Sequence, residues 1–256
     1  MIHPTAIIDP AASLGQNVTV GAYTVIGSDV VIGDDCWIGP HVVINGPTTI
    51  GRNNRFFQFG SIGEVPQDKK FAGERTELVV GDDNVFREFV TINRGTGDGG
   101  GRTVIGDGNL LMAYTHVAHD CIVGNHTIFS NAASLAGHVQ VGDHATLGGF
   151  TAVHQFTHIG AHAFSGLGAV IAQDIPPYTI VAGERARVYG INKEGLKRRG
   201  FAPDVIRALH KSFRLLLVAK VSREQAMDEL QPLIDQYPEI ATFTDFVINS
   251  KRGIAR

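Results

Sequence analysis

Apolar side chains recur at every sixth position through most of this chain, and this repeat limits the possible folds more than any other feature. The residue after a repeat position is often glycine, as in Ile26-Gly27 and Val141-Gly142. An α-helix repeats every 3.6 residues and a β-strand every two, so neither explains a period of six. A parallel β-helix of hexapeptides has this period. The repeat positions are Ile8, Leu14, Val20, Ile26, Ile32, Ile38, Ile44, Ile50, Phe56 and Ile62 in one run, and Ile105, Leu111, Val117, Val123, Phe129, Leu135, Val141, Leu147, Val153 and Ile159 in a second run, shifted by one residue.

The composition agrees with a coil that turns a corner every few residues. Glycine is abundant, at 31 of 256 residues, and it suits tight turns. The net charge of −3 gives no sign of a nucleic-acid partner, and no apolar run is long enough for a membrane span. Only two cysteines are present, Cys36 and Cys121, and the N-terminus does not look like an export signal. We therefore expect a reduced, cytoplasmic setting.

Two interruptions and one change of character divide the chain. The six-residue repeat is lost near residues 63–78 and 94–102, and we interpret both segments as loops that project from the coil. We expect a mainly β fold, with a left-handed parallel β-helix over residues 1–190. The pattern over 191–256 is helical, so a C-terminal α-helical domain should close the end of the coil. Helix starts are indicated at Pro203, Ser222 and Pro238.

Residues 18 apart should stack on one another, because three hexapeptides make one coil. This rule places His119, Gly137 and Gln155 in one column, and Asp120 and His138 in the next. A neutral histidine is the usual general base at physiological pH, and a neighbouring carboxylate can fix its tautomer. A glycine one coil away offers an unobstructed N–H, which is the kind of donor that stabilises an oxyanion. The spacing favours acid–base chemistry here, although solvated corner residues would show the same spacing.

Two further clusters have plainer explanations. His126, His144 and His162 are also 18 apart, and we interpret them as a ladder of corner side chains, with an adventitious metal site as the alternative. The helical segment begins with a basic cluster around Lys193 and Arg199. Such a cluster can bind a phosphate or an acidic partner, or it can simply be a solvated helix face.

The chain contains the motifs Ser61–Glu64, Gln67–Lys70, Thr91–Thr96, His116–Cys121, Leu135–His138, Val153–Phe156 and Gly195–Phe201. Together they resemble the UDP-N-acetylglucosamine O-acyltransferase family of lipid A biosynthesis, and the resemblance spans nearly the whole chain. It implies a homotrimer with active sites between subunits. The implied donor is an (R)-3-hydroxyacyl chain on acyl carrier protein, and the implied acceptor is the glucosamine 3-hydroxyl of the UDP-sugar. Direct transfer would need no metal and no other cofactor.

The resemblance also implies roles for individual residues. His119 matches the general base, Asp120 follows it, and Gly137 matches the donor to the thioester oxyanion. Leu167 matches a position that limits acyl-chain length, which implies a medium-length donor near 3-hydroxydecanoyl. Matches around the sugar and the pantetheine–acyl path are Gln67, Asp68, Lys70, His116, His138, His154 and Gln155. Matches on the nucleotide side are Asn192, Glu194, Arg198 and Arg199.

Three departures leave alternatives open. Lys69 replaces an aliphatic residue of the family, so the acceptor could be the 3-amino analogue of the sugar. Asn93 and Arg185 also depart from the family pattern, in places that bear on the donor. Other readings are the related N-acyltransferase, which has an extra N-terminal sugar-binding domain, a metal-dependent enzyme of the γ-carbonic-anhydrase kind, and a non-catalytic scaffold. We expect an obligate trimer, because the loop at Asp68 should leave a different part of the coil from the His119 column.

Overall fold

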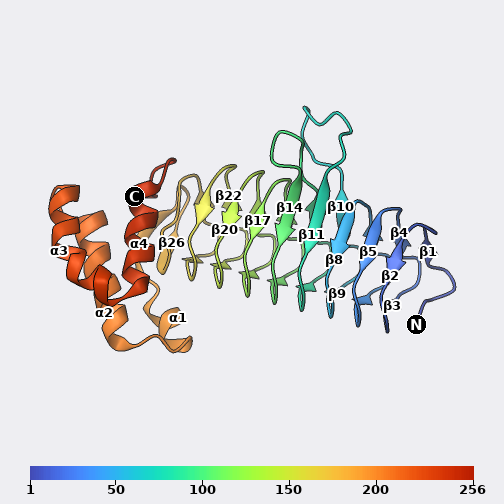
Figure 1. Cartoon of the computed structure of the whole chain (residues 1–256), viewed down its shortest axis with the longest axis horizontal. Helices are drawn as coiled ribbons and strands as arrows, with labels where there is room; N and C mark the ends of the chain where they lie inside the picture. Colours follow the sequence, from blue (N-terminus) through green and yellow to red (C-terminus); the bar gives the residue numbers. More distant parts are fainter.

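A computed structural model describes all residues, 1–256, as a long β-helix capped by a small group of helices (Figure 1). Its strands are short and stack into three sheets, to each of which a coil contributes one strand. The pairing is parallel except between the last two strands, which run antiparallel. This confirms the predicted mainly β, parallel β-helix fold with a helical C-terminal region.

The bounds of the strands follow the six-residue repeat. The first sheet holds β1 (Ile7–Ile8), β4 (Val25–Ile26), β7 (Val43–Ile44), β10 (Ser61–Glu64), β13 (Thr91–Asn93), β16 (His116–Val117), β19 (Ser134–Leu135), β22 (Ala152–Val153) and β25 (Val170–Ile171). The second sheet holds β2 (Ser13–Leu14), β5 (Val30–Ile32), β8 (Thr48–Ile50), β11 (Glu77–Val80), β14 (Arg102–Ile105), β17 (Ile122–Val123), β20 (Gln140–Val141) and β23 (His158–Ile159). The third sheet holds β3 (Thr19–Val20), β6 (Trp37–Ile38), β9 (Arg55–Phe56), β12 (Val85–Phe86), β15 (Leu110–Leu111), β18 (Ile128–Phe129), β21 (Thr146–Leu147), β24 (Phe164–Ser165), β26 (Thr179–Ala182) and β27 (Arg187–Ile191).

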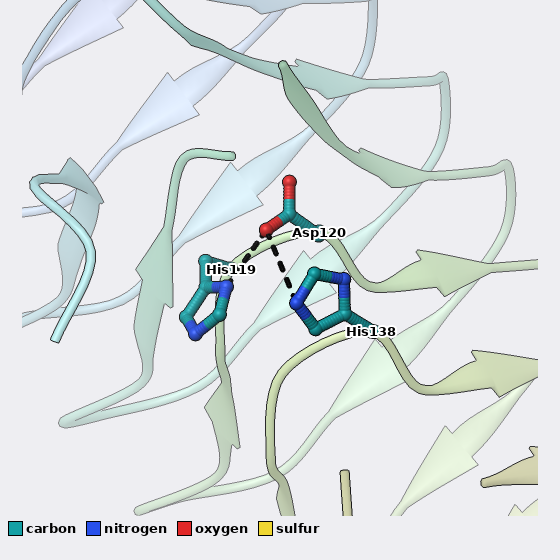
Figure 2. A group of neighbouring side chains, drawn as sticks. All are labelled: His119, Asp120 and His138. Atoms are coloured by element: carbon teal, nitrogen blue, oxygen red, sulfur yellow. Dashed lines mark hydrogen bonds and ion pairs between the residues drawn. The ribbon is translucent and has the colours of Figure 1, made fainter. Parts of the chain in front are cut away.

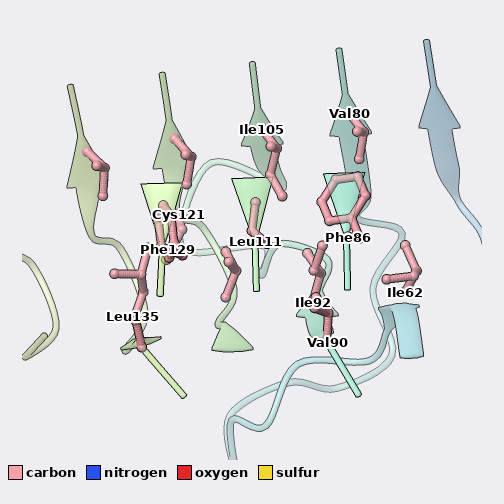
Figure 3. Close-up of a cluster of buried hydrophobic side chains, with 14 of the residues drawn as sticks. Ile62, Val80, Phe86, Val90, Ile92, Ile105, Leu111, Cys121, Phe129 and Leu135 are labelled. Carbon is pink, nitrogen blue, oxygen red and sulfur yellow. The ribbon is translucent and has the colours of Figure 1, made fainter. Parts of the chain in front are cut away.

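The repeat residues fill a narrow core inside the coil (Figure 3). Ile62, Ile92, Val117 and Leu135 come from successive coils of the first sheet, and none is measurably exposed. Each coil can bury its apolar strip only against its neighbours, so the stack forms one continuous core rather than a row of independent units.

The spacing of paired residues explains why the repeat changes phase only once. Most neighbouring coils pair residues 18 apart, such as His116 with Ser134. Across the first interruption Ser61 pairs with Thr91, a step of 30 that is a multiple of six, so the phase is kept. Across the second, Thr91 pairs with His116, a step of 25, which is one more than a multiple of six. The second loop therefore adds a number of residues that is not a multiple of six, and this produces the phase shift by one residue.

The helical end consists of α1 (Lys193–Arg198), α2 (Pro203–Phe213), the π-helical segment η1 (Arg214–Val218), α3 (Arg223–Gln236) and α4 (Pro238–Asn249). Pro203 and Pro238 stand at the starts of their helices, and the Ser222 side chain caps α3 by accepting from the Gln225 N–H at 3.1 Å. These starts were predicted from the sequence, but the π-helical segment was not. No helix in the structure combines the length and the apolar character that a membrane crossing requires.

Candidate active site

Each coil has three corners, and the corner decides which side chains can meet. We call the turns from the first to the second sheet the first corner, those from the second to the third sheet the second corner, and those from the third to the first sheet the third corner. His119, Gly137 and Gln155 all lie at the first corner.

Both long loops also leave the coil at the first corner. Residues 65–76 connect β10 with β11, and residues 94–101 connect β13 with β14; both connections run from the first sheet to the second. The expectation that the loop carrying Asp68 leaves a different part of the coil is therefore wrong. The corner could not be predicted from the repeat, because the number of residues across an interruption does not show which turn the loop has replaced.

A histidine–carboxylate pair forms the centre of this corner (Figure 2). The Nδ1 atom of His119 lies 2.7 Å from Oδ2 of Asp120. The Asp120 side chain is fully buried and that of His119 is 14% exposed. Because the carboxylate engages Nδ1, the proton is held there and Nε2 is left with a lone pair for a substrate. This geometry would allow His119 to act as a general base with Asp120 as the orienting carboxylate.

Thr96, in the second loop, holds the carboxylate in place. Its N–H donates to Oδ1 of Asp120 at 2.9 Å, and its hydroxyl donates to Oδ2 at 2.6 Å. Gly99 packs so closely on the carboxyl group that a side chain there would collide with it. Thr96 was not singled out from the sequence. The only signal for it was its place in the Thr91–Thr96 motif, because loop residues carry no periodicity.

We predict that Thr96→Val, which removes the hydroxyl but keeps the shape, lowers kcat about 10- to 100-fold, because a buried carboxylate loses one of its donors. The Michaelis constants should change less than kcat, since Thr96 is buried and its hydroxyl donates to Asp120. Steady-state kinetics check this, with Thr96→Ser as the control that keeps the hydroxyl and nearly full activity. Equal losses in both variants would show that the hydroxyl does not matter.

His138 completes a group of three side chains that could in principle bind a metal ion. The possible ligand atoms of His119, Asp120 and His138 lie within 4.8 Å of one another. His138 Nε2 is 3.8 Å from Asp120 Oδ2. A dashed line marks this contact in Figure 2. However, both carboxylate oxygens already accept hydrogen bonds, from Thr96 and from His119. These bonds fit a carboxylate that orients a histidine better than one that binds a cation.

Gly137 lies directly against the ring of His119. A Cβ atom placed on Gly137 would stand 2.5 Å from Cε1 and 2.7 Å from Nε2 of that ring. The Gly137 carbonyl accepts from Phe156, whereas its N–H donates to no backbone carbonyl. The glycine therefore leaves space for the His119 ring and presents a free N–H beside it, and such an N–H could stabilise an oxyanion.

His138 forms one wall of a pocket under the first loop. Its ring stacks on Phe156 with centroids 4.3 Å apart. Burial lowers the pKa of His138, against the opposing effect of Asp120, so the ring is neutral at neutral pH. The pocket has a volume of about 320 Å³. Its lining residues are Asp68, Lys70, Phe71, Glu74, Thr96, Asp98, Gly99, His138 and Phe156.

His116 lies on β16, on the same side of the coil. Its Nδ1 is 2.8 Å from the hydroxyl of Thr91 on the neighbouring strand. Burial lowers the pKa of His116, and the nearby His119 adds to the effect. His116 and His138 therefore both lie near His119 as neutral donors or acceptors rather than as cations.

The predicted nucleotide-side residues lie elsewhere, at the second corner. Asn192 caps α1 by accepting from the Gly195 N–H, and it donates to the His162 carbonyl. Arg199 donates to Nδ1 of His144 at 2.7 Å. Glu194 pairs with Lys197 at 3.0 Å on an exposed face of the helix. Within one chain this group, with its neighbour Arg198, does not meet His119.

The histidine ladder predicted at the second corner is present. The rings of His126 and His144 stack at 5.1 Å, and those of His144 and His162 at 4.8 Å. Stacked rings point their nitrogens sideways rather than toward a common point. Burial, His144 and Arg199 lower the pKa of His162 to about 4.

This depressed pKa gives a testable pH dependence. Between about pH 6.5 and about pH 4 the unfolded chain binds a proton at His162 that the folded chain does not. The ladder's contribution to stability is therefore present above that range and is lost as the pH falls through it. We predict that the melting temperature of His162→Gln falls less than that of the wild type when the pH is lowered from about 7.5 to about 5. The exposed His3→Gln should behave as the wild type, and an unchanged pH dependence in His162→Gln would contradict the prediction.

Comparison with known proteins identifies the family of this chain. Residues 174–255 match the family model described as UDP-N-acetylglucosamine O-acyltransferase, domain 2, and residues 29–56 and 102–137 match the bacterial transferase hexapeptide model. The acyl-[acyl-carrier-protein]–UDP-N-acetylglucosamine O-acyltransferase of Stenotrophomonas maltophilia strain R551-3 is 54% identical over 256 residues, which cover 100% of this chain and 97% of that protein. The chain belongs to the UDP-N-acetylglucosamine O-acyltransferase family. The similarly named protein of Pseudomonas entomophila is 51% identical over 255 residues, covering 100% of this chain and 99% of that protein.

Solved structures of the family have the same fold as this chain. The enzyme from Acinetobacter baumannii superposes with a TM-score of 0.96 at 42% identity, covering 100% of this chain and 99% of that one. The one from Bacteroides fragilis superposes with a TM-score of 0.97 at 39% identity, covering all of both chains. The likeness includes both the β-helix and the helical end.

Proposed function

We propose that this chain transfers an (R)-3-hydroxyacyl group from acyl carrier protein to the 3-hydroxyl of UDP-N-acetylglucosamine, the first step of lipid A biosynthesis. The full-length relatives carry the name of this activity. The observation that carries the proposal is the His119–Asp120 pair, with a free base nitrogen and the open N–H of Gly137 beside it.

The geometry supports a direct transfer. Nε2 of His119 takes the proton of the sugar hydroxyl as its oxygen attacks the thioester carbonyl carbon. Asp120 stabilises the imidazolium that forms. The Gly137 N–H donates to the negative oxygen of the tetrahedral intermediate. The C–S bond then breaks, the ester is left on the sugar, and the pantetheine sulfur leaves as a thiol with the proton returned by His119. No metal or other cofactor takes part in this scheme.

The acceptor fits the pocket under the first loop. Asp68 and Lys70 line it from the loop and His138 from the next coil, so charged and neutral groups converge beside the base. We assign these residues to the sugar. Hydroxyl groups of the sugar suit such neighbours, because carboxylate, ammonium and imidazole together offer both donors and acceptors. The other proposed contacts at this corner are Gln67, His116, His154 and Gln155.

The separation of the three corners supports a homotrimer. His119 lies at the first corner, Arg199 at the second and Leu167 at the third, so no single chain joins them. The third corner also carries exposed aromatic rings that stack along the coil, among them Phe59 and Tyr114. Exposed apolar ridges of this kind commonly lie in protein interfaces. A neighbouring chain packed there would bring Leu167 to the first corner of its partner.

The carrier protein would bind at the helical end. A groove of about 720 Å³ has an apolar floor with Ile206 and Leu215, and basic side chains around it. An acidic partner that exposes apolar groups is complementary to this surface in charge and in apolar character. The basic residues of the groove are Lys193, Lys197, Arg207, His210, Lys211 and Arg214.

We also propose a cytoplasmic location, which the free, buried thiols of Cys36 and Cys121 support.

One assay tests the proposed function. Mass spectrometry follows the products formed from acyl carrier protein thioesters with UDP-N-acetylglucosamine and with its 3-amino analogue. We expect an ester on the 3-oxygen, with a rate that falls as salt screens the basic groove. Preferred formation of an amide would assign the acceptor to the 3-amino sugar. Absence of both products would overturn the proposal, and a metal-dependent hydrolytic activity would favour the γ-carbonic-anhydrase alternative.

Leu167 is proposed to limit the acyl-chain length. Its side chain is 78% exposed in the single chain, so it is free to enter a cleft formed with a neighbour. We predict a preference for donors near 3-hydroxydecanoyl, because overpacking an apolar slot costs about 1–3 kcal/mol. Leu167→Gly should shift the preference toward 3-hydroxymyristoyl, as measured by competition between the two donors. If wild type and variant had the same preference, another residue would set the length.

A further inference from the structure

The last residues of the chain return to the β-helix and are fixed there. We call residues 250–255 the C-terminal strap; in Figure 1 the C-terminus lies beside the last coils. The Ser250 hydroxyl donates to Oδ2 of the buried Asp174 at 2.7 Å. The Asp174 N–H donates to the Gly253 carbonyl, and the Ala255 N–H donates back to Asp174. The strap is therefore a defined part of the fold.

Arg252 extends from the strap to the first corner. Its Nη2 lies 2.7 Å from Nδ1 of His154, and its Nε donates to the Ala172 carbonyl at 2.7 Å. A guanidinium has donors only and stays charged at any relevant pH. Nδ1 of His154 must therefore accept, so the ring is neutral and its proton is on Nε2. The Gln155 carbonyl, 3.1 Å from the same Nδ1, cannot accept a proton from it at the same time.

His154 lies at the first corner, one coil beyond Gly137. It follows β22, which pairs with β19, the strand that leads to Gly137. Phe156 lines the pocket at His138 and also a neighbouring pocket of about 500 Å³ that Arg252 lines. The two pockets therefore share a wall along the first corner.

We propose that Arg252 is a positioning residue for acyl transfer: it holds His154 as a neutral donor, with Nε2–H available to an oxygen of the bound substrate. This rests on the proposed function, because it assumes that the first corner binds the substrates. A cation at this position of the strap thus acts through His154 and does not itself touch the reacting atoms.

A double-mutant cycle tests the coupling. Arg252→Met should lower kcat/KM about tenfold, which is the effect of one well-placed hydrogen bond. In a His154→Gln background the same change should have almost no further effect. Ser250→Ala, which loosens the strap without touching His154, should stay near the wild type. A tenfold loss from Arg252→Met that persists without His154, or that Ser250→Ala reproduces, would show a purely structural role.

The tautomer can be measured without any activity. The ¹⁵N spectra of protein labelled at its 11 histidines should contain an Nδ1 signal of the unprotonated type that disappears in His154→Gln and changes in Arg252→Met. A protonated Nδ1 on His154 in the wild type would overturn the proposal. If the wild type had this tautomer but did not catalyse acyl transfer, the proposed function would fail while the contact with Arg252 would stand.

Discussion

His119→Ala should reduce turnover by roughly two to four orders of magnitude, because the acceptor hydroxyl loses its general base. The fold should be almost unaffected, since the side chain lies at a corner and not in the apolar core. Steady-state kinetics and thermal unfolding, measured together, check both parts. His126→Ala, from the ladder at another corner, is the matched control and should keep nearly full activity. Activity of His119→Ala within a few-fold of the wild type would remove the base from the scheme.

Gly137→Ala should cost almost as much, although it adds only one methyl group. The new Cβ would lie 2.5 Å from Cε1 of His119, so the ring must move. Displacing a catalytic group by about 1 Å commonly lowers the rate about 100-fold. The backbone at Gly137 does not have a positive φ, so alanine is tolerated there and the fold should survive.

Gly190→Ala serves as the control for that variant. Gly190 also lacks a positive φ, and nothing lies within 4 Å of the position that its Cβ would take. It should therefore keep both its activity and its melting temperature. Wild-type kinetics in Gly137→Ala would mean that the column at the first corner is looser than the structure shows, or that it is not the site of the reaction.

The fold and the columns of the first corner could be predicted from the sequence because a solenoid repeats its geometry. An 18-residue spacing places Gly137 against His119 and His138 beside Asp120 without knowledge of any distant contact. No comparable spacing rule predicts the contacts that irregular segments make. The loop residue Thr96 lies 24 positions before Asp120, and the strap residue Arg252 lies 98 positions after His154.

The position of the first loop was mispredicted because this irregular segment also lies outside the repeat. Its length is a multiple of six, so the repeat resumes in phase and gives no sign of which corner was extended. The pairing of β10 with β7 at a step of 18 and of β11 with β8 at a step of 30 places the extra residues between β10 and β11. The loop and His138 line the same pocket. The sequence motifs supplied the residues of the site, and the structure supplied the fact that Leu167 and Arg199 lie at other corners of the same chain.

The most direct test of the account is a structure of the protein with the acylated UDP-sugar bound. The account predicts that the oxygen at the sugar's 3-position lies within hydrogen-bonding distance of Nε2 of His119, that the ester carbonyl faces the Gly137 N–H, and that Asp120 still binds Nδ1. A sugar bound away from the first corner, or a 3-oxygen out of reach of His119, would contradict it.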